Sequence, residues 1–233
     1  MTVGITGGLP EPIGLLPGSL LLDRDWLSGQ VRDTGTFYGC QEPRLSATLW
    51  WYSTSAVLIG QSVHELVLLG AGLSLDPAVL RMTARPSGLE RVVPGHPLAP
   101  GPAAFGRHLD AALAPVIAAL GDVGQVTSQS LWAVAADSLA TRLLASRAPD
   151  PAALAAQVAA ACSPLSPTPR FVEVPGRPGA APSTYVHRVS CCLIYRVPMG
   201  KCLSCPRQLP AERRERLEAH AAARAPSPSP SPS

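Results

Sequence analysis

The sequence predicts a mainly α-helical domain with a few short strands, followed by a cysteine-rich segment near the carboxyl terminus. Three observations lead to this prediction. Apolar residues recur at helical spacing through most of residues 44–162. Proline and glycine then crowd residues 163–184, where regular helices cannot continue. Four of the six cysteines follow within a single short stretch, Arg188 to Arg207.

These changes in composition divide the 233 residues into five parts. The order is an irregular segment (1–43), a helical body (44–162), a Pro/Gly-rich connection (163–184), a cysteine segment ending in a polar helix (185–224) and a disordered tail (225–233). The tail ends in the low-complexity repeat PSPSPSPS, which cannot bury a core.

Within this frame, periodicity and capping residues predict the individual elements. Helices are expected over 20–26, 44–69 with a break near Gly60, 76–85, 105–120 with a kink at Pro115, 127–146, 150–162 and 210–223. For the helix over 76–85, Asp76 would be the N-cap, Pro77 the first position and Pro86 the stop. Short strands are expected over 89–93 and 171–174.

Composition and charge exclude some functions. A net charge of +3 is too small to indicate a nucleic-acid partner. The amino terminus lacks the basic and apolar regions of a signal peptide, and no stretch reaches the roughly 18 apolar residues of a transmembrane segment. We therefore expect a cytoplasmic protein without a transmembrane segment; peripheral association with a membrane stays open. In a reducing cytosol, clustered cysteines favour metal or redox sites over disulfides.

Cys191, Cys192, Cys202 and Cys205 form the candidate site. Thiolates are soft ligands, which select zinc or iron–sulfur clusters. Zinc sites commonly pair two C-x-x-C knuckles, and the adjacent pair Cys191-Cys192 does not make one. A two-iron cluster offers two separated metal ions to adjacent cysteines, although the spacing matches neither common ferredoxin pattern. The residues favour a cluster and leave zinc open.

The pattern CC-x9-C-x2-C, led by Arg188 and followed by Pro206, resembles the carboxy-terminal segment of the FhuF-like ferric siderophore reductases. The flanking residues YRVP and G-x-C fit as well, although that family has ten residues between the second and third cysteines and this chain has nine. The resemblance implies a 2Fe-2S cluster on the four cysteines. It also implies an oxidoreductase that reduces iron in a ferric siderophore by one electron, in the cytosol, with hydroxamate siderophores as the expected type.

Residues near the four cysteines allow two interpretations each. Between Tyr185 and Arg207 there are four basic residues and no carboxylate, which would favour the reduced form of an anionic cluster or simply form a solvated basic face. His187 could donate to a cluster sulfur but fits a surface histidine better. Cys40 and Cys162 are interpreted as structural.

Two other functions remain open at this point. No nucleotide-binding fingerprint is present, so a reductase would need an external electron donor. The main alternative is a zinc-stabilised helical domain that binds a partner without redox activity. A ferredoxin-like carrier that ignores ferric chelates is the third.

Overall fold

The computed structural model describes residues 14–176 and 181–224, and the predicted disordered tail lies outside them. The fold is mainly α, as predicted. The helices are α1 (Arg24–Tyr38), α2 (Pro43–Leu69), α3 (Pro102–Gly124), α4 (Ser128–Ala145), α5 (Pro151–Ala160) and α6 (Pro210–Arg224), with short 3-10 turns η1 (Gly18–Leu22) and η2 (Ile194–Arg196). The strands are β1 (Leu16–Pro17), β2 (Arg81–Arg85), β3 (Gly88–Val93), β4 (Phe171–Val174) and β5 (Ser183–Val186).

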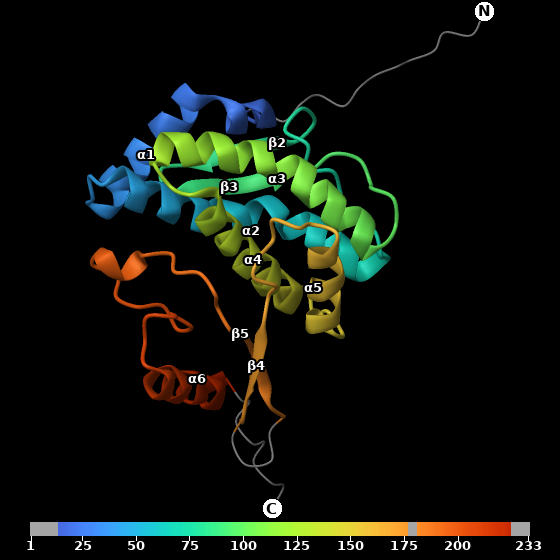
Figure 1. The fold of residues 1–233 in the computed structure, drawn as a ribbon, viewed down its shortest axis with the longest axis vertical. Coiled ribbons are helices and arrows are strands. Elements are labelled where there is room, and N and C mark those ends of the chain that lie inside the picture. The colour runs from blue at the N-terminus through green and yellow to red at the C-terminus, as the bar shows by residue number, and fades with distance from the viewer. Residues whose placement is uncertain (1–13, 177–180, 225–233) are drawn as a thin grey trace, which may run out of the picture.

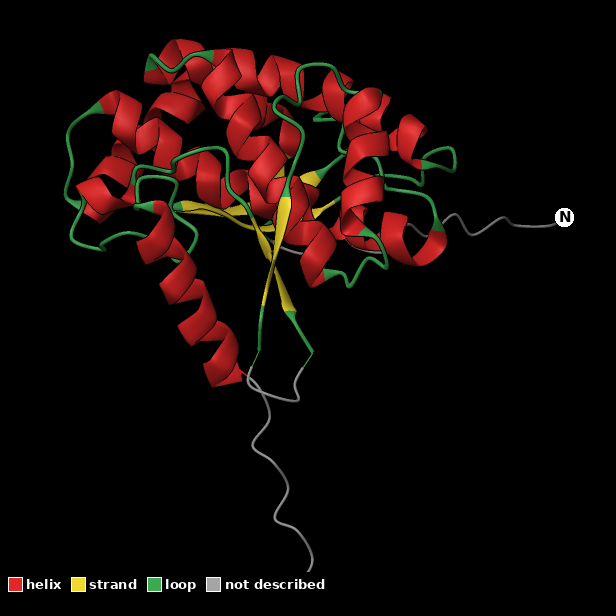
Figure 2. Cartoon of the chain, turned by 60° about the horizontal axis from the view of Figure 1, so that its bottom comes forward, coloured by secondary structure: helices red, strands yellow, loops and turns green. Residues whose placement is uncertain are grey.

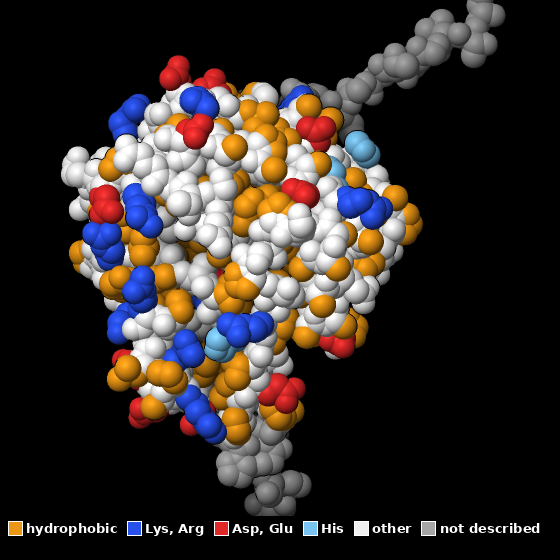
Figure 3. All heavy atoms as spheres, in the orientation of Figure 1, with side chains coloured by type: hydrophobic (Ala, Val, Ile, Leu, Met, Phe, Trp, Pro, Cys, Tyr) orange, Lys and Arg blue, Asp and Glu red, His pale blue; other side chains and the backbone are white. Residues whose placement is uncertain are grey.

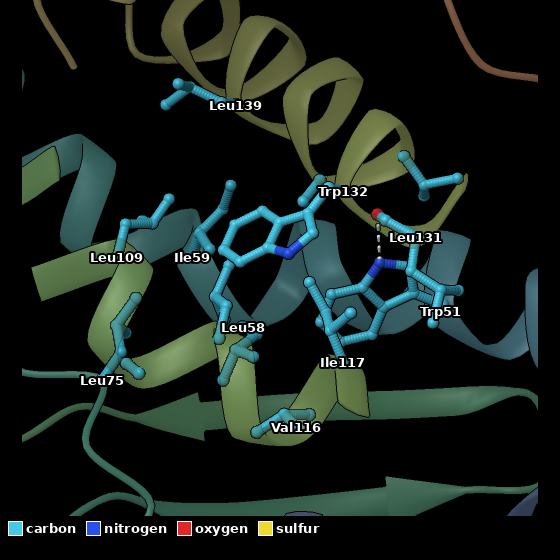
Figure 4. Close-up of a cluster of buried hydrophobic side chains, with 14 of the residues drawn as sticks. Trp51, Leu58, Ile59, Leu75, Leu109, Val116, Ile117, Leu131, Trp132 and Leu139 are labelled. Atoms are coloured by element: carbon cyan, nitrogen blue, oxygen red, sulfur yellow. Dashed lines mark hydrogen bonds between the residues drawn. The ribbon is translucent and has the colours of Figure 1, made fainter. Parts of the chain in front are cut away.

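The core lies where α2, α3 and α4 meet. Few aromatic residues are present, but Trp50, Trp51 and Phe105 are all fully buried there. The indole Nε1 of Trp51 donates to the carbonyl oxygen of Leu131 at 2.8 Å (Figure 4). This bond satisfies a polar group that would otherwise be costly to bury, and it fixes α2 against the start of α4.

Helix α4 separates two parts of the molecule. Figure 1 shows α3 and the strands β2 and β3 on one side of it, and the cysteine segment, in orange and red, on the other. Its N-cap is Thr127, whose side chain accepts from the Ser130 N–H. The predicted helix over 127–146 is confirmed, and so is the one after Asp150, which caps α5 through the Ala153 N–H.

The long helices differ from the predictions in detail. Helix α2 runs through Gly60 without a break, and the side chain of Arg142 packs against that glycine. Helix α3 contains Pro115, as predicted, and extends further at both ends than residues 105–120. By length and composition α3 could cross a membrane, but 44% of its most apolar 18 residues is buried in the fold.

The predicted helix over residues 76–85 is wrong. Asp76 does act as a cap, because its carboxylate accepts from the Ala78 N–H at 2.9 Å, but it caps only a turn. Residues Arg81–Arg85 then form β2, which pairs antiparallel with both β1 and β3. Met82 is buried in the core from this strand. Pairing with two neighbours outweighs the local helical signal.

The amino-terminal segment is also more ordered than predicted. Residues 1–43 were expected to be irregular, with only a short helix over 20–26, yet Arg24–Tyr38 forms the helix α1. Asp23 caps it by accepting from the Asp25 and Trp26 N–H groups. Gly39 ends it in the left-handed region at φ 67°, which glycine adopts without strain. The low hydrophobicity of this helix hid its periodicity.

After α5 the chain forms an extension from the helical body. The predicted strand over 171–174 is β4, and it pairs antiparallel with β5, which the sequence did not predict. Figure 2 shows this hairpin extending away from the body beside α6. The predicted polar helix is α6, which packs on the hairpin through a small core of Val174, Leu217 and Ala221.

Candidate metal centre

The four predicted site cysteines lie in two loops that face each other. Cys191 and Cys192 lie between β5 and η2, and Cys202 and Cys205 lie in the turns before α6. Cys192 and Cys205 are 1% exposed, whereas Cys191 and Cys202 are partly exposed. Each loop therefore contributes one buried and one accessible thiol.

The thiols come together across the loops in two pairs. Arg188 Nη1 lies near both Cys192 Sγ and Cys202 Sγ, so these two thiols face each other across the loops. Burial raises the pKa of Cys191 and Cys205 raises that pKa further, which indicates that these two thiols also lie close together. Each pair thus takes one cysteine from the adjacent pair and one from the C-x-x-C. Side chains of neighbouring residues diverge, so the two pairs hold separate positions.

The Arg188 guanidinium lies against one of these pairs. Its Nη1 donates to the Cys202 Sγ at 3.4 Å and to the Cys192 Sγ at 3.7 Å. The guanidinium also stacks on the Tyr52 ring of α2, 4.7 Å from the ring centroid. The side chain is buried, which would by itself lower the pKa of Arg188, but facing Cys192, Tyr52 and Asp137 raises that pKa overall. A permanent positive charge is therefore held beside the sulfur atoms.

Asp137 on α4 fixes this arrangement, and the sequence analysis missed it. Its carboxylate accepts from Arg188 Nε at 3.3 Å. It also accepts from the Val189 N–H at 3.0 Å, the Ser190 N–H at 2.9 Å and the Ser190 hydroxyl at 2.5 Å. Asp137 is 3% exposed, and Ala135, Ala136, Ser138 and Leu139 beside it on α4 are buried as well. A carboxylate on an otherwise apolar helix face was the sequence signal that could have identified Asp137.

The charge of Arg188 changes the acidity of the thiols. The hydrogen bond from Cys202, together with Arg188, lowers the pKa of Cys192 well below that of a free thiol, although burial opposes this. The same bond keeps the proton on Cys202 and raises its pKa. Burial raises the pKa of Cys191. The thiolate is the form that binds metals, so a lowered pKa at Cys192 favours its role as a ligand.

The paired geometry discriminates between the two predicted metals. A structural zinc ion needs its ligands gathered around one point. Within residues 14–176 and 181–224, no three His, Cys, Asp or Glu side chains converge closely enough for a single ion. A two-iron cluster instead takes two thiolates at each iron. Two thiol pairs from two facing loops fit that requirement better.

A second contact holds the first loop to the helical body. Val197 packs on Leu45 and Leu49 of α2 in a small buried cluster. At its edge, Arg196 pairs with Glu42 at 2.8 Å. The loop then closes through Gly200, which has a φ of 68°. Glycine adopts this left-handed conformation without strain, so the chain can turn sharply just before Cys202.

The remaining cysteines and His187 lie apart from the thiol pairs. Cys162 is buried in the main core, where burial raises its pKa to about 12. Cys40 is part of the cluster around Val197, with its Sγ 3.4 Å from the Ser46 hydroxyl. His187 faces Arg213 and the β4–α6 side instead of the cysteines, and its buried Nδ1 has no partner among the described residues. His187 is half-buried and lines a hollow, so its expected role as a surface histidine stays a prediction.

Basic side chains gather on one face of the molecule near the cysteine segment, together with some acidic ones (Figure 3). Figure 3 shows Lys and Arg side chains along the left and lower left of the molecule, where Figure 1 places the cysteine segment and α6. Cations near an anionic thiolate site offset its charge. The surface is thus suited to a centre that gains negative charge.

Comparison with known families agrees with this geometry. Residues 188–207 match the family described as the FhuF 2Fe-2S C-terminal domain. This confirms the resemblance seen in the sequence over those residues, and it confirms a 2Fe-2S cluster as the cofactor of the segment. No curated protein matches the chain.

Proposed function

We propose that this protein reduces ferric siderophores by one electron, with Cys191, Cys192, Cys202 and Cys205 as the ligands of its 2Fe-2S cluster. The single observation that carries the proposal is that two facing loops bring the four cysteines together, with Cys192 and Cys202 both bonded to Arg188 Nη1 and Cys191 beside Cys205. The match to the FhuF 2Fe-2S domain supports the same assignment. Under this proposal the pair Cys192/Cys202 would bind one iron and the pair Cys191/Cys205 the other.

The chemistry of the substrate makes one electron sufficient. Hard oxygen donors such as hydroxamates hold ferric iron far better than ferrous iron, so reduction loosens the metal. The cofactor supplies that electron when bound, and the protein supplies its orientation and potential. We propose hydroxamate siderophores as the substrate, the cytosol as the location and an external protein or small molecule as the electron donor.

The residues of the chain have separate tasks in this function. Arg188 donates to two sulfur atoms and keeps a positive charge beside them. Hydrogen bonds to sulfur and nearby cations stabilise the reduced state and raise the potential. Asp137 holds Arg188 and the loop after it to α4. Burial of Cys192 and Cys205 keeps solvent away from half of the ligand set.

The first test is the metal content of protein purified without air. We expect about two irons and two sulfides per chain, with visible absorption that bleaches on adding dithionite. The reduced protein should then be reoxidised by a ferric trihydroxamate. One zinc per chain without sulfide or colour would refute the proposal and favour the zinc-stabilised binding domain. Reoxidation by a protein acceptor but not by ferric chelates would favour the ferredoxin-like carrier.

Cysteine variants assign the ligands. Serine at any of the four site cysteines should abolish the stable cluster, because a hard hydroxyl replaces a soft thiolate. The matched controls are Cys40→Ser and Cys162→Ala, which change thiols outside the two pairs. Both controls should keep the iron and sulfide content of the wild type. Loss of the cluster in either control would place the ligand set elsewhere.

A further inference from the structure

We propose that the ferric chelate docks in a hollow beside Cys202, between the end of α4, strand β5 and the loop that follows Cys202. This inference rests on the proposed function. The hollow has a volume of about 530 Å³. Binding sites for small molecules commonly range from about 300 to 1,000 Å³, so a siderophore-sized ligand fits this space.

The position of the hollow gives a docked chelate a direct route to the cluster. Cys202 forms part of its wall, together with Arg188. Cys192, the partner of Cys202 in its pair, is buried behind it. Electron transfer weakens steeply with distance, so a chelate in this hollow would receive its electron through the Cys202 side of the centre.

The lining matches an uncharged, oxygen-rich ligand. The polar part of the wall consists mainly of residues with a hydroxyl group: Tyr52, Thr141, Ser183, Thr184, Tyr185 and Ser204. The Thr141 hydroxyl already donates to the Asp137 carbonyl oxygen and the Tyr185 hydroxyl is bonded to His220, which leaves the other four hydroxyls for a ligand. Hydroxyls can donate to the oxygen atoms of a chelate. Among the described residues that line the hollow there is no carboxylate, so no carboxylate there would compete with the siderophore for iron.

The one charged side chain in the wall is already engaged. Arg188 is paired with Asp137, stacked on Tyr52 and bonded to two sulfur atoms. It therefore has little capacity to neutralise a highly anionic ligand. A ferric trihydroxamate has no net charge at the iron, whereas a ferric tricatecholate carries three negative charges. The lining thus selects the hydroxamate class.

A second hollow on the opposite side of the centre provides the comparison. It touches Cys191, measures about 250 Å³ and contains Arg44 and Arg207. This volume lies below the usual range for small-molecule sites. Its two arginines suit an anionic partner better than a neutral chelate. The two hollows therefore reach different thiol pairs and have different chemistry.

The reaction at the docked chelate needs no bond to the protein. A cluster held by Cys191, Cys192, Cys202 and Cys205 would supply one electron to the ferric ion, so that the cluster would lose one electron and the chelated iron would become ferrous. The external donor proposed above restores the electron. The hydroxamate oxygens then leave the ferrous ion and take protons from water. No other oxidant or reductant is required.

Two alanines of α4 give a matched test. Ala145 is exposed and lines the hollow at Cys202, whereas Ala133 lines the hollow at Cys191. Ala145→Trp should fill the first hollow and Ala133→Trp the second. Thr184→Trp fills the first hollow from the exposed face of β5 and does not depend on α4.

The main readout is binding, measured by calorimetry with the gallium(III) complex of a trihydroxamate. Gallium has the charge of ferric iron and is not reduced under these conditions. We expect Ala145→Trp and Thr184→Trp to weaken binding of the gallium complex by about ten-fold or more, because the indole ring fills the hollow and the complex loses its contacts there. Ala133→Trp should stay within about two-fold of the wild type.

Redox controls separate this inference from the proposed function. All three variants should keep the absorption of the cluster and should be reoxidised by ferricyanide, a small oxidant, at the rate of the wild type. If the reduced wild type reacts with a ferric trihydroxamate but Ala145→Trp and Thr184→Trp bind gallium complex normally, the docking site is wrong and the function stands. If the wild type itself neither binds the complex nor reacts, both are overturned.

Discussion

Replacing Asp137 with asparagine removes the charge that holds the cysteine segment to α4. One carboxylate oxygen accepts from Arg188 Nε and from the Ser190 N–H and hydroxyl, and the other accepts from the Val189 N–H. An asparagine has only one acceptor oxygen, so at least one backbone N–H must face an amide N–H. The guanidinium also stays buried without its counter-charge.

The magnitude follows from the burial of the pair. The side chains of Arg188 and Asp137 are 7% and 4% exposed. Removing one partner of such a buried pair costs about 3–5 kcal/mol. Because about 1.4 kcal/mol changes an equilibrium constant tenfold, local opening of the segment should become roughly 100- to 4,000-fold more frequent. The helical body, whose core is elsewhere, should stay folded.

Hydrogen exchange measured by mass spectrometry tests this expectation. Amides of the segment with internal partners, such as those of Arg196 and Cys205, should exchange faster in the variant by the factor given above. The control is Asp122→Asn, which breaks an ion pair with Arg24 whose side chains are 58% and 69% exposed. Such a pair contributes about 1 kcal/mol or less. If amide exchange in residues 188–207 rises less than tenfold in Asp137→Asn, the Asp137–Arg188 pair does not hold the segment as argued.

Three further predictions concern the charge, the pH dependence and the packing. Arg188→Gln should lower the midpoint potential of the cluster by on the order of 100 mV, because the interaction of a unit charge with the nearby sulfur atoms is worth a few kcal/mol. A redox titration measures this potential. His108 accepts from the Leu75 N–H at 2.7 Å, and burial lowers the pKa of His108. The contribution of His108 to folding stability should therefore be complete above about pH 6.5 and fall as the pH drops through the folded pKa. His108→Gln should flatten the pH dependence of urea unfolding. Gly106→Ala places a Cβ against the Val158 carbonyl oxygen and should cost about 1–3 kcal/mol in urea unfolding.

Each of these predictions has a contrary outcome. Arg196→Gln removes an exposed cation and should shift the potential much less, so equal shifts would remove the special role of Arg188. Asp76 raises the pKa of His108 and His96 lowers it, so an unchanged acid-side slope in His108→Gln would assign the effect to other groups. Gly29 on α1 has room for a Cβ, so Gly29→Ala should stabilise the protein by about 0.5–1 kcal/mol. An equal gain in Gly106→Ala would contradict the close packing of Gly106 against Val158.

The helical body could be predicted where the signals are local. The caps at Thr127 and Asp150 act on N–H groups within three residues, so the sequence shows both the cap and the helix it begins. Residues 76–85 failed for the opposite reason. Their strand exists because of partners in β1 and β3, and the local capping pattern around Asp76 carries no information about those partners. Helix α1 was missed because few of its residues are apolar.

The candidate centre divides in the same way. By itself the sequence determined the four cysteines, their spacing and the resemblance that the family match over residues 188–207 confirmed. These features lie within one short stretch of chain. Only the tertiary structure decided which thiols pair, that Asp137 binds Arg188 from 51 residues away, and that a hollow opens beside Cys202. Such contacts depend on which surfaces meet after folding, and a spacing pattern along the chain does not encode them.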